Sequence, residues 1–387
     1  AMTWYVPIGR WHDYHWDLNV QMSYWLVLPS NHAGLGNSLV AQMKRNLNFL
    51  IASVPPQFQN DSAAQAANTG WEGRSSCDAF LLSNTTTADG WDCFEHGPAA
   101  AAADEDGRDG KGAGGAVQYG DLPWVAHNLW WQYRYTLDPE TLDVCVSVLK
   151  RAVGYYMRLM TTNGTTLHLP LAESPEYASA VDTNYDLSLF RWGVGVLLHV
   201  ADTLQPTLKA EPAYARWKSV ATTLTPFPVG ESGLLIGQDV ALTHGHRHWS
   251  HLFSMFPTTL LNPGASAAGA NAGAAPSPLH SDLAEKSLDH YATMNGADKF
   301  RPTIQNGFPR VAISTMSGMV VRSEGAYGNL SVWFASTSAA NEGYGGGSMG
   351  VNLGPNTMYQ EAGGAPCNES PLGAAFAIQS WLLSSFS

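Results

Sequence analysis

The chain has 387 residues, of which 45% are hydrophobic, so it can bury a large core in one big domain or in two to three average ones. Lysine and arginine number 20 against 32 aspartate and glutamate, and the net charge of −12 disfavours nucleic acid and anionic membrane surfaces as partners. Only 13% of the residues are charged, while 14 are Trp and 15 are Tyr, a composition common in secreted carbohydrate-active proteins.

The segment 11–25 packs rings and polar groups closely together. Its large rings are Trp11, Tyr14, Trp16, Tyr24 and Trp25, and it also holds two Asp, two His, an Asn and a Gln. Buried polar groups cost free energy unless they are paired, so the segment is either an aromatic core with a satisfied hydrogen-bond network or a binding site. Rings that stack on sugar faces, beside carboxylates and amides that bind hydroxyls, suit a carbohydrate.

Most of the remaining chain has apolar residues at helical spacing. The turn Asn163-Gly164 separates two of these segments, and the β-branched and aromatic runs within 311–335 fit either strands or helices rich in Ser and Thr. The count of roughly ten to twelve helices favours one all-α domain over residues 1–387, a closed ring of helical hairpins with a few short strands. We predict helices over residues 39–54, 124–135, 142–160, 187–204, 210–224, 281–294 and 372–386.

Two low-complexity segments, near 99–116 and 262–278, interrupt the helical pattern. Because they cannot bury enough apolar area to order themselves, we expect surface insertions there. No run reaches the ~18 apolar residues that span a bilayer. The N-x-[ST] sequons indicate a secreted or extracytoplasmic glycoprotein. They lie at Asn60, Asn84, Asn163, Asn329 and Asn368.

The cysteines do not form a CxxC pair, which disfavours a zinc knuckle. Cys77 and Cys93 flank one irregular segment and could form a disulfide. Cys145 lies in a helical pattern, which predicts a buried free thiol.

Glu176 is a candidate catalytic acid. Pro175 restricts the backbone and keeps Ser174 out of the helical region, so Glu176 is held on a rigid loop. The alternative is a first-turn helix residue that the helix dipole favours.

The segment 244–251 holds four histidines, with His244 and His248 four residues apart. It has no HExxH pattern, and no neighbouring carboxylate in the sequence is placed as a third ligand. A hydrogen-bonding wall of a pocket is therefore favoured over a metal site.

Three segments together resemble the catalytic domain of glycoside hydrolase family 95, the inverting α-L-fucosidases and α-L-galactosidases. Segment 19–25, Asn-Val-Gln-Met-Ser-Tyr-Trp, is similar to that family's Asn-x-Gln-Met-Asn-Tyr-Trp motif. Segment 174–176 is similar to its Ser-Pro-Glu-Asn motif, and segment 246–252 to its His-Arg-His-Leu-Ser-His-Leu motif. Weaker similarity covers 124–133 and 368–383. In the first of these segments, Asn128 stands in place of a His.

The resemblance implies an (α/α)6 barrel and inversion without a cofactor or metal. It implies that Glu176 is the general acid, whose pKa we expect an apolar wall to raise. Asn19 falls on one of two asparagines that orient the catalytic water, and Asp17 stands where the other is expected. Glu369 stands where the family has its catalytic base Asp, with Asp17 as the competing candidate. The implied substrate-binding residues are Trp11, His15, Trp16, Trp130, His246, Arg247, His248, Trp249 and His251.

The implied substrate is an oligosaccharide or polysaccharide with a terminal L-fucose-like or L-galactose-like sugar. Two other classes fit the same pattern. One is a carbohydrate-binding protein that lost its chemistry through the changes at Asp17 and Glu369. The other is a polysaccharide lyase, which helical toroids also host; the acidic net charge disfavours it, because a uronate polymer is itself negative.

Overall fold

The computed structural model describes residues 14–16, 18–52, 85–86, 118–261, 278–297, 307–320, 322–338, 352–353, 359–361, 365–366 and 368–383. Trp11, Asp17, Cys77, Cys93 and the insertion near 99–116 lie outside the described residues, as does the insertion near 262–278 up to residue 277. Of His15 only the backbone is described.

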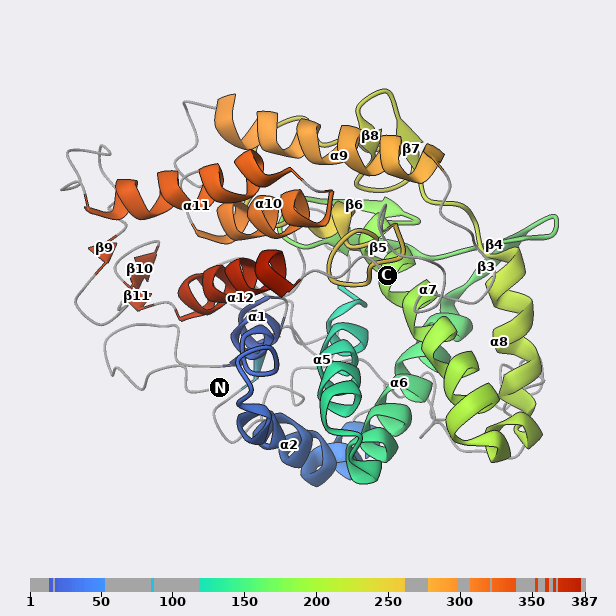
Figure 1. The fold of residues 1–387 in the computed structure, drawn as a ribbon. Coiled ribbons are helices and arrows are strands. Elements are labelled where there is room, and N and C mark those ends of the chain that lie inside the picture. The colour runs from blue at the N-terminus through green and yellow to red at the C-terminus, as the bar shows by residue number, and fades with distance from the viewer. Residues whose placement is uncertain are drawn as a thin grey trace.

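Helices dominate the described part of the chain, which confirms the all-α class (Figure 1). Helix α1 packs against α12, so segments from opposite ends of the sequence lie side by side. From α12 the contacts continue to α10 and α9, and from α1 they continue through α5 to α6, α7 and α8. The bounds are α1 (Asn19–Trp25), α2 (Ala33–Ala52), α5 (Asp121–Thr136), α6 (Pro139–Leu159), α7 (Asn184–His199), α8 (Pro212–Thr223), α9 (Pro278–Ala297), α10 (Gly307–Met319), α11 (Ser323–Ser338) and α12 (Glu369–Leu383).

Local sequence signals explain where two central helices begin. Helix α6 starts with Asp138 as its N-cap, whose carboxylate accepts a hydrogen bond from the Thr141 amide at 2.9 Å, and Pro139 follows at the first helical position. Helix α7 starts with Thr183, whose hydroxyl oxygen accepts from the Asp186 amide at 3.1 Å. These caps satisfy amides that have no partner within the helix.

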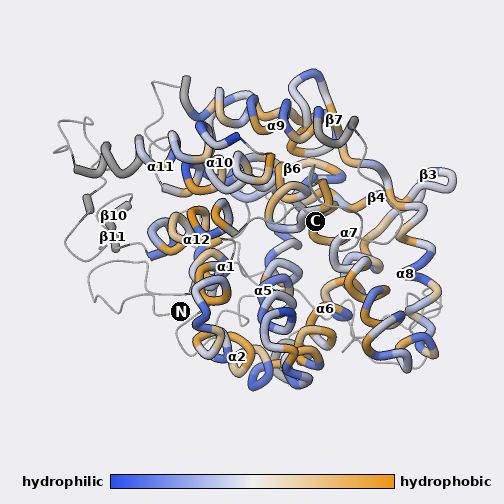
Figure 2. The backbone as a smooth tube through the Cα atoms, in the orientation of Figure 1, coloured by the Kyte–Doolittle hydropathy of each residue, from blue (hydrophilic) through white to orange (hydrophobic). Residues whose placement is uncertain are grey.

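The core consists of two apolar clusters, one centred on α5, α6, α7 and α8 and the other on α1, α9, α10 and α12. Apolar stretches alternate with polar ones along the helices that contribute to them (Figure 2). Aromatic rings join the two clusters through helix α5. Trp131 packs against both clusters and stacks on Phe376 of the second one, with ring centroids 5.8 Å apart.

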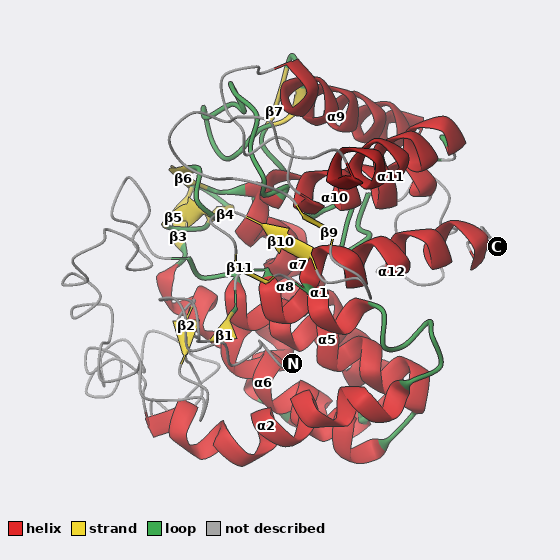
Figure 3. Cartoon of the chain, turned by 90° about the vertical axis from the view of Figure 1, so that its left-hand side faces the viewer, coloured by secondary structure: helices red, strands yellow, loops and turns green. Residues whose placement is uncertain are grey.

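The described strands are short and antiparallel and lie beside the helices (Figure 3). The hairpin of β5 (Leu171–Ser174) and β6 (Ala178–Val181) positions the candidate acid, with Ser174 opposite Ala178 at its closed end. The remaining strands are β1 (Tyr14–His15), β2 (Thr85–Thr86), β3 (Thr161–Asn163), β4 (Thr166–His168), β7 (Val229–Gly230), β8 (Gly233–Leu234), β9 (Asn352–Leu353), β10 (Tyr359–Glu361) and β11 (Ala365–Pro366). Among these described strands, β11, β10 and β9 form a three-stranded sheet, and the others form two-stranded sheets.

Several sequence predictions are confirmed and one ambiguity is resolved. Asn163-Gly164 forms the turn between β3 and β4, and Cys145 is a buried free thiol. The segment 311–335 is helical in its described part, forming most of α10 and α11. Ser314, Thr315 and Ser331 in this segment donate to backbone carbonyls, as Thr315 does to Val311 at 2.8 Å.

Helix α7 continues into a π-helical turn, Val200–Leu204. By length and composition alone, Asn184–Leu204 could cross a membrane, but 67% of its most apolar window is buried inside the protein. A core helix passes the same test, and α7 packs against α6 and α8.

Candidate active site

A tight turn at the end of the β5–β6 hairpin presents Glu176. The Tyr177 amide donates to the Ser174 carbonyl at 3.0 Å, with Pro175 and Glu176 at the two central positions of the turn. Glu176 has a φ of 54°, in the left-handed region that favours glycine and asparagine. The alternative of a first-turn helix residue is therefore wrong, and the turn fixes the backbone that carries the side chain.

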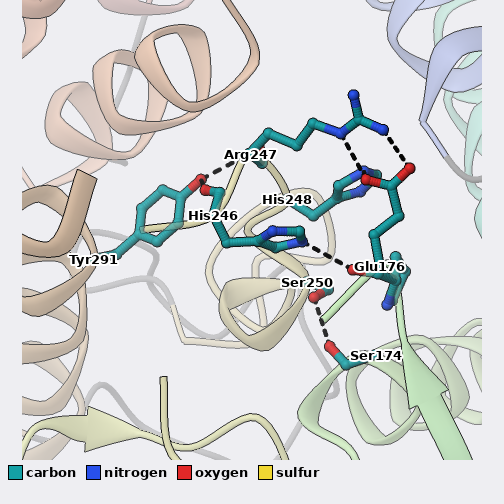
Figure 4. A network of polar contacts seen from close by, with 8 residues as sticks. Ser174, Glu176, His246, Arg247, His248, Ser250 and Tyr291 are labelled. Carbon is teal, nitrogen blue, oxygen red and sulfur yellow. Dashed lines mark hydrogen bonds and ion pairs between the residues drawn. The ribbon is translucent and has the colours of Figure 1, made fainter. Parts of the chain in front are cut away.

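Arg247 and His248, from the segment 243–249, meet the Glu176 carboxylate (Figure 4). Arg247 donates from Nε to Oε2 at 2.6 Å, and its Nη2 donates to Oε1. The Nε2 atom of His248 lies 3.2 Å from the same Oε2. The Glu176 side chain is still 38% exposed, so the ion pair lies at a surface that a ligand can reach.

These partners reverse the pKa that we expected for Glu176. Burial would raise the pKa, but the charges and hydrogen bonds of His248 and Arg247 outweigh it and hold the pKa well below its usual range. The prediction of an apolar wall that raises this pKa is therefore wrong for the sugar-free protein. The reason is that the fold places His248 and Arg247, rather than apolar side chains, against the carboxylate.

Neutral hydrogen bonds brace the segment that carries Arg247. His246 Nε2 donates to the Pro175 carbonyl at 3.0 Å, and burial lowers the pKa of His246 to about 3, so its ring is neutral. The Tyr291 hydroxyl donates to the His246 carbonyl at 3.0 Å. Ser174 and Ser250 share a hydrogen bond at 2.7 Å, which ties the hairpin to the same segment (Figure 4).

A second polar group lies where α1 and α12 begin. Asn19 Nδ2 donates to Glu369 Oε1 at 2.9 Å, although the two residues are 350 positions apart. Glu369 is only 6% exposed and occupies the first turn of α12, where a carboxylate interacts favourably with the helix dipole. The structure thus brings together two candidate residues from opposite ends of the sequence.

Packed rings connect the two groups. Trp249 follows His248 in the chain and meets Trp25 of α1 at 5.8 Å. Trp25 in turn contacts Phe376 of α12 at 5.6 Å. The segment that carries Arg247 and the helices that carry Asn19 and Glu369 therefore share one core cluster.

Glu176, His246 and His248 have donor atoms within 4.8 Å of one another, so the expectation that no carboxylate stands beside these histidines is wrong. A divalent cation there would have to compete with Arg247, whose guanidinium already bonds both carboxylate oxygens. The donor set fits a charged hydrogen-bond network better than a metal centre.

Five of the described residues predicted to bind substrate are buried; His248 reaches Glu176, and the other four lie in the core. Trp249 is 1% exposed, and its indole N–H donates to the Phe256 carbonyl at 3.1 Å. In this structure neighbouring side chains cover these rings, so we assign them to packing rather than to sugar stacking. The four are Trp16, Trp130, Trp249 and His251.

Sequence reasoning missed two aromatic residues. Tyr291 lies on α9, and nothing in its sequence context marks it. Tyr177 stacks on His244 with ring centroids 4.6 Å apart, and its hydroxyl accepts from the Thr243 amide at 2.7 Å. The signal for Tyr177 was its position directly after the candidate acid.

Comparison with known protein families identifies the family of this chain. Residues 9–281 match the profile described as the glycosyl hydrolase family 95 catalytic domain. A search of curated proteins finds no similar one. Because the match covers more than half of the sequence, the chain belongs to this glycoside hydrolase family.

Proposed function

We propose that this family 95 member is an inverting exo-glycosidase that removes a terminal L-fucose-like or L-galactose-like sugar from an oligosaccharide or polysaccharide. Glu176 is the general acid, and Glu369 is the general base, with Asp17 as the competing candidate. Asn19 helps to orient the attacking water. The helices form the (α/α)6 barrel that the family resemblance implies, and the chemistry requires no cofactor.

The observation that carries this proposal is the hydrogen bond of 2.9 Å between Asn19 and Glu369. An amide and a carboxylate side by side can both accept a hydrogen bond from one water molecule. Such a pair can hold the water and remove its proton as it attacks the sugar. Inversion requires the acid on the opposite side of the glycosidic bond, at a carboxyl separation of about 6.5–9.5 Å.

The sugar itself would meet charged and polar groups around Glu176. Arg247 carries planar donors that suit pairs of hydroxyls, and His248 adds a ring nitrogen at the carboxylate. Tyr177 and His244 add a stacked aromatic face beside them. Arg247 and His248 thus keep their predicted substrate-binding role, and Tyr177 and His244 replace the four buried residues in it.

A catalytically drifted sugar-binding protein is the second candidate. The observation that favours it is the ion pair between Arg247 and Glu176, because an acid that stays ionised cannot protonate a leaving group. Glu369 also stands where the family carries the shorter Asp. The family match disfavours the lyase alternative.

The test is proton NMR of the purified chain with α-L-fucosides, α-L-galactosides and β-glycosides. We expect one sugar to appear first as its inverted anomer, and we expect Glu176→Gln and Glu369→Gln to slow its release about 10²–10⁴-fold. Glu231→Gln is the matched control, because Glu231 is an exposed carboxylate in the turn between β7 and β8.

Appearance of the retained anomer would contradict inversion. Sugar binding without release from any substrate would support the binding-protein candidate. Loss of activity in Asp17→Asn with little effect of Glu369→Gln would move the base role to Asp17.

The protein is proposed to be secreted or extracytoplasmic and glycosylated at Asn163, which is exposed at the β3–β4 turn. Asn329 accepts a hydrogen bond from Arg310 and donates one to the Gly325 carbonyl, so its sequon should be empty. Asn368 directly precedes the proposed base and should also be empty. An intact glycopeptide at Asn368 by mass spectrometry would contradict the role of Glu369.

A further inference from the structure

The ion pair between Arg247 and Glu176 conflicts with the role of an acid. A general acid must carry a proton when the substrate is bound, yet a guanidinium bonds both oxygens of this carboxylate. Arginine has only donors, so a protonated Glu176 would turn a hydroxyl hydrogen toward N–H groups that cannot accept it. The observed pairing therefore fits only the ionised form.

We propose that Arg247 is a positioning residue that clamps Glu176 as a carboxylate in the sugar-free protein, and that the sugar hydroxyls draw Arg247 away so that Glu176 can take up its proton. This inference rests on the proposed function and adds the step that prepares the acid. Arg247 thereby couples substrate binding to protonation.

The backbone at both ends of the ion pair is held, so the side chains can exchange partners while the main chain stays in place. Glu176 is fixed by the turn and its positive φ. The Arg247 carbonyl accepts from the Tyr291 hydroxyl at 3.3 Å, while the Arg247 side chain is 22% exposed (Figure 4). The guanidinium can therefore rotate toward a ligand without moving the segment.

The other titratable groups facing Glu176 in the described part of the chain come from the same segment. His248 lies 3.2 Å from Oε2, and the neutral His246 stacks on His248 with ring centroids 5.2 Å apart. After Arg247 leaves, His248 remains the hydrogen-bond partner of the carboxyl group. Arg247 is thus the charge that a ligand can draw away, while His248 stays at the carboxyl group.

The proton balance of the cycle follows from this arrangement. Sugar binding takes up one proton from solvent, which converts the Glu176 carboxylate into a carboxylic acid. The acid gives this proton to the leaving-group oxygen as the glycosidic bond breaks. The base takes a proton from the attacking water and later returns it to solvent. Glu176 ends the cycle as a carboxylate and can pair with Arg247 again.

The first test measures Glu176 directly in the sugar-free protein, without using activity. The side-chain carboxyl carbons of glutamate are labelled with ¹³C, and Glu176 is assigned from its missing signal in Glu176→Gln. We expect the wild-type signal to stay ionised to the lowest pH at which the protein remains folded. In Arg247→Gln the titration midpoint should rise by about one pH unit or more, the typical effect of one opposite charge at contact distance.

Two variants make this test specific. Arg247→Lys keeps the charge but loses the planar pair of donors, and we expect a smaller rise. Arg322→Gln is the matched control. Arg322 also bonds two carboxylates, but these belong to Glu285 and Asp289 of α9 rather than to the candidate site. This variant should leave the Glu176 signal unchanged. A Glu176 that titrates in the ordinary range in the wild type, or that does not respond to Arg247→Gln, overturns the clamp.

The second test is the pH dependence of the hydrolytic rate. The profile of kcat/KM reports the pKa of Glu176 in the free enzyme, and the profile of kcat reports it in the substrate complex. Because the clamp lowers the pKa only in the free enzyme, kcat/KM should begin to fall, tenfold per pH unit, at a lower pH than kcat does. Arg247→Gln should bring the two profiles together. Coincident wild-type profiles would overturn the coupling. If no glycoside is cleaved, the proposed hydrolase function fails, and the carboxyl titration still decides whether Arg247 clamps Glu176.

Discussion

Glu176 and Asp186 are two carboxylates of this protein whose pKa values move in opposite directions. Glu176 stands on an exposed turn, and its interactions with His248 and Arg247 hold its pKa below the usual range despite partial burial. Asp186 is fully buried in the first turn of α7, and burial raises its pKa to about 7. Its partners are hydroxyls, Tyr156 at 2.5 Å and Thr183 at 2.6 Å, which lower the pKa but carry no charge.

The difference shows that a shifted pKa does not by itself mark a catalytic group. A cation beside Glu176 more than offsets the cost of removing the carboxylate from water, whereas two hydroxyls beside Asp186 do not. Asp186 lies in the first turn of α7, directly after its N-cap region, and Tyr119 and Tyr185 lie close enough to interact electrostatically with its carboxylate. Position and partners, rather than the size of the shift, separate the candidate acid from a structural carboxyl group.

The largest expected effect is on the hydrolytic rate, which should depend strongly on Glu176 and only weakly on Asp186. Glu176→Gln should lower the hydrolytic rate about 10²–10⁴-fold, because the group that protonates the leaving group is lost. Asp186→Asn should change the rate only a few-fold, since Asp186 bonds to core hydroxyls. The measurement is kcat on the glycoside that is cleaved fastest. A loss of activity in Asp186→Asn as deep as that in Glu176→Gln would remove the distinction.

The next effect concerns stability against pH. The stability that protonated Asp186 contributes is fully present below its unfolded pKa of 3.8 and is lost as the pH rises toward 7. Asp186→Asn cannot ionise, so its free energy of unfolding should fall less over that range. The difference between the two proteins should change by roughly 4 kcal/mol, since one pKa unit corresponds to ~1.4 kcal/mol. Urea unfolding between pH 4 and 8 measures it, and parallel curves would contradict the raised pKa.

Removal of one hydroxyl partner should give a smaller effect. Tyr156→Phe deletes the donor that lies 2.5 Å from Asp186. Above pH 7, where Asp186 is ionised, we expect a loss of about 2 kcal/mol, because hydrogen bonds to charged groups contribute ~1.5–3 kcal/mol. At pH 5 the loss should be smaller, since the carboxyl group is then protonated. An equal loss at both pH values would show that Tyr156 acts through packing alone.

The smallest effect tests the turn at Glu176. Glu176→Gly and Glu176→Ala both delete the carboxylate, but only glycine adopts a φ of 54° without strain. We expect the glycine variant to be more stable by about 1 kcal/mol, the cost of the left-handed conformation for a residue with a Cβ. Thermal unfolding of the two variants compares them. An alanine variant of equal or higher stability would mean that the turn relaxes.

The parts of the site that sequence reasoning predicted are those encoded by short motifs. The segments around Glu176, Arg247 and Asn19 were identified because each motif places its residues within a few positions. The role of the buried rings was not predictable in this way, because a Trp such as Trp16 or Trp249 has the same local sequence pattern in a core as in a sugar site. Asp17 and Trp11 lie outside the described residues, so their predicted roles remain predictions.

The helices follow from the sequence by itself, because apolar spacing and caps act over a few residues. Examples are Asp138 and Pro139 at the start of α6. In the same way, Pro175 marks the turn that carries Glu176. Only the tertiary structure decided that Asn19 meets Glu369 and that Arg247 meets Glu176. Those contacts join residues 350 and 71 positions apart, and they exist only when several helices pack together. The partner of a charged group sets its protonation state, so the chemistry at Glu176 was decided by packing that no local pattern encodes.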